Sequence, residues 1–345
     1  MVYKHPGTKP FSCVISMVIV IAIMAISSGC IIENLHPELV KRGAEFPGSH
    51  KCGDCHVDIY NEWVESSHSQ SYISEEFRVS TNNYEFKFCI RCHVPETIFT
   101  LLENDEIAPR DYNLKDGVDC HGCHLTVDCT LAGPHSGISP HPIEKKEELF
   151  KSGELCGKCH VDTFEEYLMY VADNDETCQD CHMPAVRRKL IQDEPWQKLH
   201  VRKEGKAHTF SSLSALKNNK DFIELTFTEI SNSNKQIKGK VEILNTKVNH
   251  SIPTGKYGYK EVLLLINLKD NFGRIVKSKQ ESMFVELNTQ LKPGVKKIYS
   301  FVFDIDGENG VKEMEAVLFR TNFNRTNKTL LAKAELELGL PKSSQ

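Results

Sequence analysis

The feature that most constrains the fold of this chain is the pattern Cys-x-x-Cys-His, which occurs five times between residues 52 and 182. In this pattern the two thiols bond to a haem, and the adjacent histidine becomes the proximal ligand of its iron. The copies are Cys52/Cys55/His56, Cys89/Cys92/His93, Cys120/Cys123/His124, Cys156/Cys159/His160 and Cys178/Cys181/His182. The pattern therefore predicts five covalent c-type haems.

The competing interpretation is structural zinc, because paired cysteines also form zinc ribbons. Zinc sites use cysteine pairs two at a time, whereas this chain has an odd number of pairs, and they do not require a histidine directly after every pair. The other cysteines, Cys13, Cys30 and Cys129, leave no even-numbered disulfide framework. Haem is therefore the favoured cofactor.

The motifs follow one another so closely that porphyrin is expected to form much of the core of this region. Neighbouring haems should then lie near contact, which is what fast electron hopping requires. After the first motif, Val57, Tyr60 and Val64 fall at helical spacing, and Val161, Phe164 and Leu168 do so after the fourth. Each of these two motifs is thus expected to start a short amphipathic helix.

Length and charge set further limits. A chain of 345 residues favours two domains, and a hydrophobic content of 40% is ordinary for a globular protein. The net charge of -5 argues against nucleic acid or an anionic membrane surface as a partner.

Residues 1–30 resemble an export leader. Two lysines precede an apolar run at 11–26, and Gly29-Cys30 follows, as in bacterial lipoprotein signals. Ser27 stands where that signal usually has leucine, so a retained anchor helix and simple cleavage stay open as alternatives. Each outcome exports the chain to the periplasm or cell surface, and lipidation at Cys30 would anchor it to the membrane. Residues 31–48 are interpreted as a tether.

Residues 49–210 are predicted to form a mostly helical, haem-packed domain with an internal repeat. Cys52-Gly53-x-Cys55-His56-Val57-Asp58 recurs at 156–162, and an aromatic, a glutamate and another aromatic follow both copies. The second and fifth motifs share Cys-His-x-Pro more weakly. The sequence thus indicates the order A, B, centre, A, B.

Residues 211–340 contain no haem motif. Seven alternating or β-branched runs lie near 221–230, 237–248, 261–269, 274–285, 295–305, 313–322 and 329–338, separated by polar or glycine-containing turns. They predict an antiparallel β-sandwich of immunoglobulin-like type, so the chain as a whole is expected to be an α+β multidomain protein. The ordinary role of such a domain is structural support or docking.

Function depends on the second axial ligand of each haem, because a six-coordinate iron transfers electrons whereas an open position can bind a substrate. The distal candidates are His68, His135, His208 and His250, followed by His200 and His141. In the repeat, the position equivalent to His68 is Ala172, so one distal ligand of the repeated pattern is lost or relocated.

The first motif with Tyr60, Trp63 and His68, the segment Gly117-Val118-x-Cys120, and the closing Cys181-His182-Met183-Pro184 carry a family resemblance. The chain resembles the multihaem cytochrome c superfamily that includes the tetrahaem electron acceptor of hydroxylamine oxidoreductase. The C-terminal domain is similar to β-sandwiches that follow such haem domains and carry a Gly-His-x-x-Pro-Thr-Gly loop; here Asn249 replaces the first glycine. The resemblance implies electron transfer between redox partner proteins, although some relatives are enzymes.

Three hypotheses follow. The first is an exported pentahaem cytochrome that relays electrons, with no catalytic residues of its own. The second is an oxidoreductase that acts on a small nitrogen or sulfur compound at one open haem. The third is a subunit of an extracellular cytochrome filament, in which a histidine of one subunit ligates a haem of the next.

Overall fold

The computed structural model describes residues 35–100, 106–171, 176–194, 196–211, 222–233, 235–305, 310–322 and 324–338. The predicted leader with Cys30, and the repeat position Ala172, lie outside the described residues. Among the residues that are described, no helix has both the length and the apolar character that a membrane span requires.

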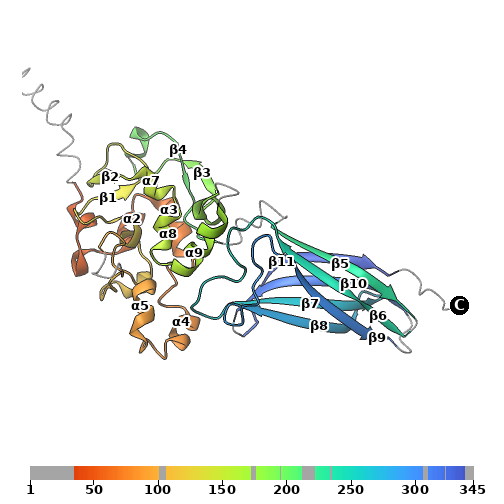
Figure 1. The fold of residues 1–345 in the computed structure, drawn as a ribbon. Helices are drawn as coiled ribbons and strands as arrows, with labels where there is room; N and C mark the ends of the chain where they lie inside the picture. Colours follow the sequence, from red (N-terminus) through yellow and green to blue (C-terminus); the bar gives the residue numbers. More distant parts are fainter. Residues whose placement is uncertain are drawn as a thin grey trace, which may run out of the picture. The chain divides into compact units, whose positions relative to one another are not determined.

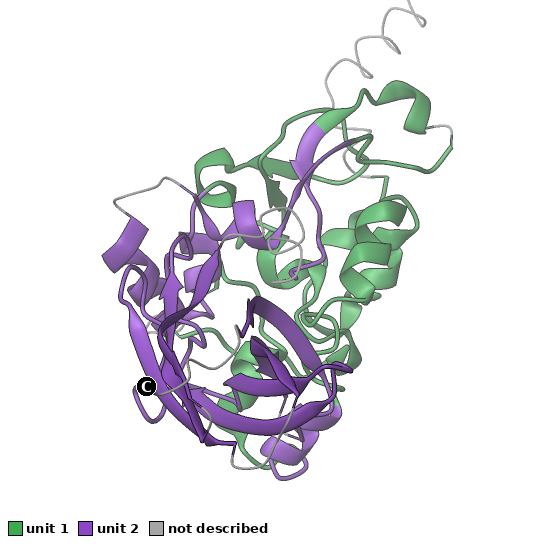
Figure 2. Cartoon of the chain, turned by 90° about the vertical axis from the view of Figure 1, so that its right-hand side faces the viewer, with its two compact units in different colours: residues 1–74, 84–151, 188–203 green, residues 75–83, 152–187, 204–345 purple. Residues whose placement is uncertain are grey.

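Two compact units divide the chain (Figure 2). The first comprises residues 1–74, 84–151 and 188–203, and the second comprises residues 75–83, 152–187 and 204–345. The first three haem motifs belong to the first unit, whereas the fourth and fifth belong to the unit that also contains the long β-strands. The domain limits at residues 48 and 210 rest on sequence alone and stay a prediction.

Short helices joined by turns make up most of the first unit (Figure 1). Its elements are η1 (Pro37–Val40), η2 (Gly43–Glu45), α2 (Ser49–Gly53), α3 (Val57–Val64), α5 (Lys87–His93), η3 (Leu114–Asp116), α6 (Cys120–His124), β1 (Leu131–Gly133), β2 (Ile143–Lys145), α7 (Glu147–Phe150) and η5 (Trp196–Leu199). Strands β1 and β2 pair in parallel. Two further short strands, β3 (Ala185–Arg188) and β4 (Lys203–Lys206), also pair with each other.

The described residues of the second unit form four helices and two antiparallel sheets of long strands. The helices are α4 (Glu75–Ser80), α8 (Glu154–Gly157), α9 (Val161–Tyr170) and α10 (Cys178–His182). The strands are β5 (Ile223–Asn232), β6 (Gln236–Asn245), β7 (Glu261–Asp270), β8 (Ile275–Phe284), β9 (Lys297–Asp304), β10 (Val311–Thr321) and β11 (Lys328–Glu337). One sheet has the order β5-β6-β9 and the other β11-β10-β7-β8. All seven predicted strands are present, and the α+β class is confirmed.

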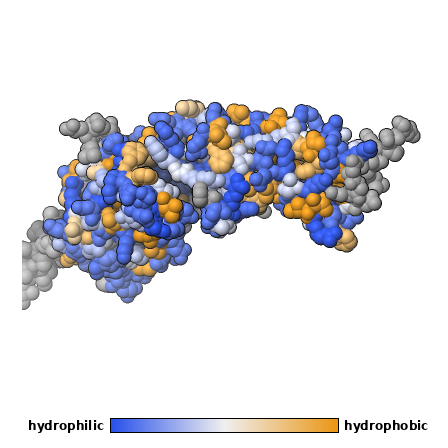
Figure 3. Space-filling view, turned by 90° about the horizontal axis from the view of Figure 1, so that it is seen from below, coloured by the Kyte–Doolittle hydropathy of each residue, from blue (hydrophilic) through white to orange (hydrophobic). Residues whose placement is uncertain are grey.

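The two sheets enclose one hydrophobic core. Val241 of β6 stands opposite Tyr299 of β9, and Leu264 of β7 stands opposite Leu318 of β10. Val241, Leu264 and Leu318 are fully buried and belong to a cluster drawn from both sheets. On the face shown in Figure 3, by contrast, hydrophobic residues form small groups separated by hydrophilic ones.

The repeat is visible in the backbone as well as in the sequence. His56 precedes α3 with φ -94° and ψ 53°, and His160 precedes α9 with φ -93° and ψ 52°. The predicted helices after these two motifs are therefore confirmed, and each begins at the residue after its histidine. A β-carbon on Gly53 would lie 2.6 Å from the ring of Tyr60, and one on Gly157 would lie 2.5 Å from the ring of Phe164. Both repeats thus need glycine where an aromatic ring packs on the backbone.

This packing predicts the effect of adding a methyl group. Gly157→Ala should lower the free energy of unfolding by about 1–3 kcal/mol, because the new β-carbon overlaps the Phe164 ring. Denaturant unfolding of the holoprotein measures the change. Gly205→Ala is the control, since nothing lies within 4 Å of the position that its β-carbon would occupy. Equal stability of the two variants would contradict the prediction.

Candidate functional site

The five motifs adopt two local forms. In the first and fourth motifs the helix ends after the first cysteine, and the histidine precedes a second helix. In the second, third and fifth motifs the histidine is the last residue of the helix, namely His93 of α5, His124 of α6 and His182 of α10. In both forms the pair of thiols and the imidazole are brought together within a few residues, as attachment to one haem requires.

The predicted attachment cysteines differ in their exposure to solvent. Cys92, the second cysteine of the second motif, is exposed, whereas Cys159, at the same place in the fourth motif, is half-buried. Each of these two cysteines also takes part in an interaction within the protein. A haem bonded at Cys92 would therefore have one edge near the surface. Neither observation tests the thioether bond itself, so haem attachment at Cys92 and Cys159 stays a prediction, as it does at the other eight motif cysteines.

Short helices of this kind need caps because they have few internal hydrogen bonds. Asp119 precedes α6, and its carboxylate accepts a 2.8 Å hydrogen bond from the amide of Gly122. Thr177 precedes α10, and it forms a reciprocal capping box with Asp180. These two capping residues therefore fix α6 and α10 so that each helix begins at the first cysteine of its motif.

A buried arginine holds the segment before the third motif. The guanidinium of Arg110 donates to the carbonyls of Pro95 at 2.9 Å and Gly117 at 2.5 Å, and it lies 3.4 Å from the Asp119 carboxylate. Both charged side chains are 1% exposed. Burial raises the pKa of Asp119 to about 6, against the opposing effect of Arg110. Asp119 is therefore half protonated near pH 6, and the pair becomes fully ionised only as the pH rises well above that value.

The variant Arg110→Lys tests whether the arginine stabilises the segment before the third motif. A lysine cannot reproduce the forked hydrogen bonds, so buried carbonyls lose their donors. We expect a loss of about 3 kcal/mol or more in the free energy of unfolding at about pH 8, measured with denaturant. Arg91→Lys is the control, because Arg91 forms only a partly exposed ion pair with Glu106 and should cost about 1 kcal/mol or less. Similar losses in both variants would contradict this role of Arg110.

Backbone carbonyls orient three of the five motif histidines. The Nδ1 atoms of His56, His93 and His124 each donate a 2.6 Å hydrogen bond, to the carbonyls of Leu190, Ser71 and Ala132 respectively. A hydrogen bond at Nδ1 fixes the tautomer and the ring orientation in which Nε2 is the ligating nitrogen. These contacts are the arrangement expected of proximal haem ligands.

Two pairs of histidines stand at the separation that one iron requires. With a metal–nitrogen bond of about 2 Å on each side and each ring centre about 1 Å behind its nitrogen, the ring centres of a bis-imidazole site lie about 6 Å apart. The ring centroids of His56 and His141 are 6.4 Å apart, and those of His182 and His250 are also 6.4 Å apart. The residues present thus fit a bis-histidine haem at the first and fifth motifs.

The electrostatics favour the same role. Burial lowers the pKa of His141 and that of His182 to about 4, and it also lowers the pKa of His56 and His250. All four rings are therefore neutral at physiological pH. Neutral imidazole is the form that binds a metal.

The other candidates lie in different surroundings. The His68 carbonyl accepts a 2.9 Å hydrogen bond from Val118, just before the third motif. His135 follows β1, the strand whose Ala132 carbonyl holds His124. The Nδ1 of His208 donates to the Lys206 carbonyl at 3.0 Å, and its ring packs edge to face on Phe210.

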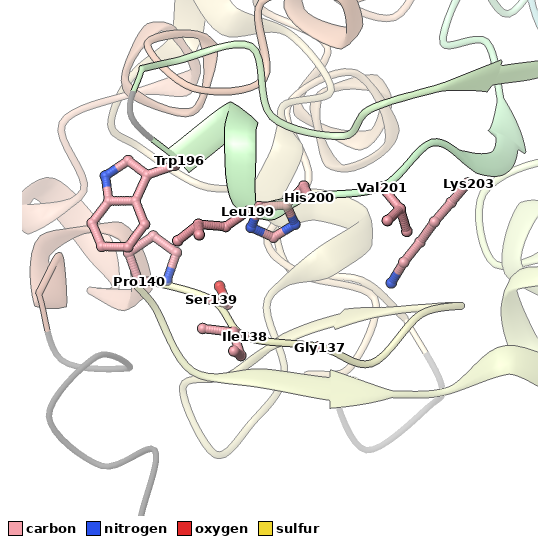
Figure 4. A pocket seen from close by; sticks show the side chains of 9 residues that line it. All are labelled: Gly137, Ile138, Ser139, Pro140, Trp196, Leu199, His200, Val201 and Lys203. Carbon is pink, nitrogen blue, oxygen red and sulfur yellow. The ribbon is translucent and has the colours of Figure 1, made fainter. Parts of the chain in front are cut away.

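His200 lines a pocket in the first unit (Figure 4). Trp196, Leu199 and Lys203 lie on the same wall as His200, and the loop 137–140 forms the opposite wall. That loop leads directly into His141, and the Ser139 hydroxyl lies 3.2 Å from the His141 ring. The pocket wall therefore includes Pro140, the residue directly before His141 of the His56–His141 pair.

Thiols from different motifs also meet. Cys120 of the third motif is close enough to Cys52 of the first to raise the pKa of its thiol, and Cys156 of the fourth motif is close enough to Cys178 of the fifth to lower the pKa of its thiol. The fifth motif therefore lies beside the fourth, and in the same way the third motif lies beside the first.

The sequence alone ranks His141 below the four principal distal candidates, and it predicts no role for Glu62 or Glu166. His141 lies between Pro140 and Pro142, and these two prolines restrict its backbone. The repeat places Glu62 and Glu166 at equivalent positions, and both make specific contacts. Glu62 accepts two hydrogen bonds from Arg188, at 2.6 and 2.8 Å. Arg188 lies two residues before Leu190, whose carbonyl accepts the hydrogen bond from His56.

Comparison with known proteins supports the motif assignment. Residues 51–125 match the family model described as cytochrome c554 and c-prime. No curated protein matches the chain. Among solved structures, a penta-haem cytochrome c552 from Thermochromatium tepidum is similar over 84% of this chain and 98% of that chain, with 15% identity and a TM-score of 0.53. At that identity the likeness shows the fold alone.

The strand-rich part has weaker likenesses. A putative β-galactosidase from Bacteroides fragilis matches with 14% identity and a TM-score of 0.22, over 34% of this chain and 16% of that chain. The putative ApaA protein from Bordetella pertussis matches with 17% identity and a TM-score of 0.22, over 35% of this chain and 94% of that chain. Neither carries an argument about function. The motifs and the family match over residues 51–125 support c-type haem binding in that part of the chain, and the structural likeness supports a multihaem cytochrome fold.

Proposed function

We propose that the protein is a pentahaem cytochrome whose five irons are all six-coordinate with two histidines each, so that it relays electrons rather than transforming a substrate. The observation that carries this proposal is the pair of 6.4 Å histidine separations, His56 with His141 and His182 with His250. Bis-histidine haems have no open position for a substrate and have lower potentials than histidine/methionine haems.

The number of histidines available as distal ligands matches this proposal. With His141 and His250 assigned, three motif histidines still need a partner, and His68, His135 and His208 are the remaining principal candidates. His121 is held by other contacts, since its ring stacks on Phe46 at 3.5 Å and its Nε2 donates to the Leu39 carbonyl. His200 is then a spare histidine at the pocket beside the first haem.

The contacts between thiols support a relay. Because each haem is bonded to its own cysteines, the Cys52–Cys120 contact makes the first and third haems neighbours, and the Cys156–Cys178 contact does the same for the fourth and fifth. Neighbouring haems within each unit give electrons short steps. The protein would supply axial ligands and spacing, while the iron cycles between its ferric and ferrous states.

Spectroscopy of ligand variants tests the coordination. The purified protein should show five haems by mass and only low-spin signals by electron paramagnetic resonance. His141→Ala and His250→Ala should each convert one haem of five to a high-spin, carbon-monoxide-binding form, because each removes one sixth ligand. His36→Ala is the control, since His36 contacts the Glu38 side chain and belongs to neither pair. A high-spin haem in the unmodified protein would instead favour the oxidoreductase hypothesis.

We also propose export and lipid anchoring, on the strength of the leader at residues 1–30. Cysteine lipidation at Cys30 would hold the haem units at a membrane surface where redox partners are within reach. Cys30→Ser should move the protein from the detergent phase to the aqueous phase in phase partitioning. Unchanged partitioning of this variant would sink lipidation at Cys30 and leave the retained anchor helix.

The finer class of the β-domain is likewise proposed to be immunoglobulin-like. Its support is the strand order, in which a three-stranded sheet β5-β6-β9 and a four-stranded sheet β11-β10-β7-β8 share one core. Consecutive strands β6 and β7 lie in different sheets, as in sandwiches of that type. The connection between these two strands carries His250.

A further inference from the structure

The loop that carries His250 is fastened at two sides. On the β-sheet side, the fully buried Asn245 side chain donates to the carbonyls of Val248, at 3.2 Å, and His250, at 3.1 Å, and it accepts from the Val248 amide at 3.0 Å. Ile252 and Leu291 exchange two backbone hydrogen bonds just beyond. These contacts shape the loop, but they do not connect it to a haem motif.

Glu166 makes that connection. It lies on α9, six residues after the proximal His160 of the fourth motif. Its Oε2 accepts a 2.9 Å hydrogen bond from the Ser251 amide and a 2.8 Å hydrogen bond from the Thr254 hydroxyl. The two donors bracket the Ile252-Pro253 step directly after His250. One carboxylate oxygen therefore ties the loop to the helix.

Neighbouring groups reinforce this contact. Asp162, one turn earlier on α9, accepts from the Lys256 amide at 3.2 Å, and the Thr163 hydroxyl lies 3.2 Å from that of Thr254. Ser251 is 3% exposed, so its amide would have no water to replace the carboxylate if Glu166 were lost. The charges of Asp162, Glu166, Glu286 and Arg320 all influence the pKa of Lys260, and Arg320 also lowers the pKa of His182.

We propose that Glu166 is the positioning residue for the sixth ligand of the fifth haem. By holding the 251–254 segment against α9, it keeps His250 opposite His182. The helix that follows the fourth haem motif would thus control the coordination of the fifth haem, and the β-domain would donate a ligand rather than only dock. This inference rests on the proposed bis-histidine coordination.

The repeat supplies an independent parallel. Glu62, at the equivalent position after His56, holds Arg188 and thereby the segment whose Leu190 carbonyl orients that histidine. In both repeats the glutamate of the helix after the motif fastens a segment distant in the sequence that contacts an axial histidine. The two glutamates act on different ligands, the proximal one in the first repeat and the distal one in the second.

Glu166→Ala and Glu166→Gln test the proposal in the haem-loaded protein. The alanine variant should show about one haem of five in a high-spin, carbon-monoxide-binding form, because the loop loses its tie to α9. Glutamine keeps an acceptor oxygen and should restore most of the low-spin signal. Glu165→Ala is the matched control, since Glu165 is the preceding residue on the same helix and is exposed. Circular dichroism checks that each variant is folded.

The outcomes separate the two proposals. If His250→Ala leaves every haem low-spin, the ligand assignment is wrong, and the proposed function fails with it. If His250→Ala creates a high-spin haem but Glu166→Ala does not, only the role of Glu166 is overturned. If Glu166→Ala does not fold, Thr254→Val removes one of the two hydrogen bonds to Glu166, together with the hydroxyl contact to Thr163. It should then produce a smaller high-spin fraction, and a fully low-spin spectrum of this variant would overturn the proposal.

Discussion

The 6.4 Å spacing of two pairs of histidine rings is the constraint on which the proposed haem sites depend. An iron with two histidine ligands requires ring centres about 6 Å apart. The chain meets this requirement with residues far apart in sequence, 85 positions for His56 and His141 and 68 for His182 and His250. The turns, capped helices and β-strands between them serve to bring these rings together. Burial then keeps the rings neutral and able to bind.

Hydrogen bonds to backbone carbonyls and carboxylates provide the next level of control. Leu190, Ser71 and Ala132 each direct a carbonyl at the Nδ1 of a motif histidine. Glu62 and Glu166 hold the segments on which such contacts depend. Because the hydrogen bonds at Nδ1 set ring orientation and basicity, they also influence the haem potential. The first and fourth motifs thus share a glutamate as well as the predicted haem attachment residues.

Sequence similarity between motifs and the proximity of their thiols describe different relations. The shared Cys-His-x-Pro pairs the fifth motif with the second, yet the thiol contacts give the fifth motif the place beside the fourth that the third has beside the first. A proline two residues after a histidine reflects only the local exit of the chain from a helix. The neighbour of a motif is decided by packing. The β-strands show the same difference between local and tertiary information. The alternation of apolar and polar residues predicts where each strand lies in the sequence, but it does not predict the order of the strands in the sheets.

The amino-acid sequence predicts five haem attachment motifs with their proximal histidines, and it located the repeated helix after the first and fourth motifs and the seven strands. Each of these depends on residues within one short segment, where covalent chemistry and side-chain periodicity act locally. Only the tertiary structure decided that His141, rather than a nearer histidine, faces His56, and that a loop between β6 and β7 brings His250 to His182. Distal ligation joins segments far apart in the sequence, and no local pattern encodes which of several histidines will reach a given iron.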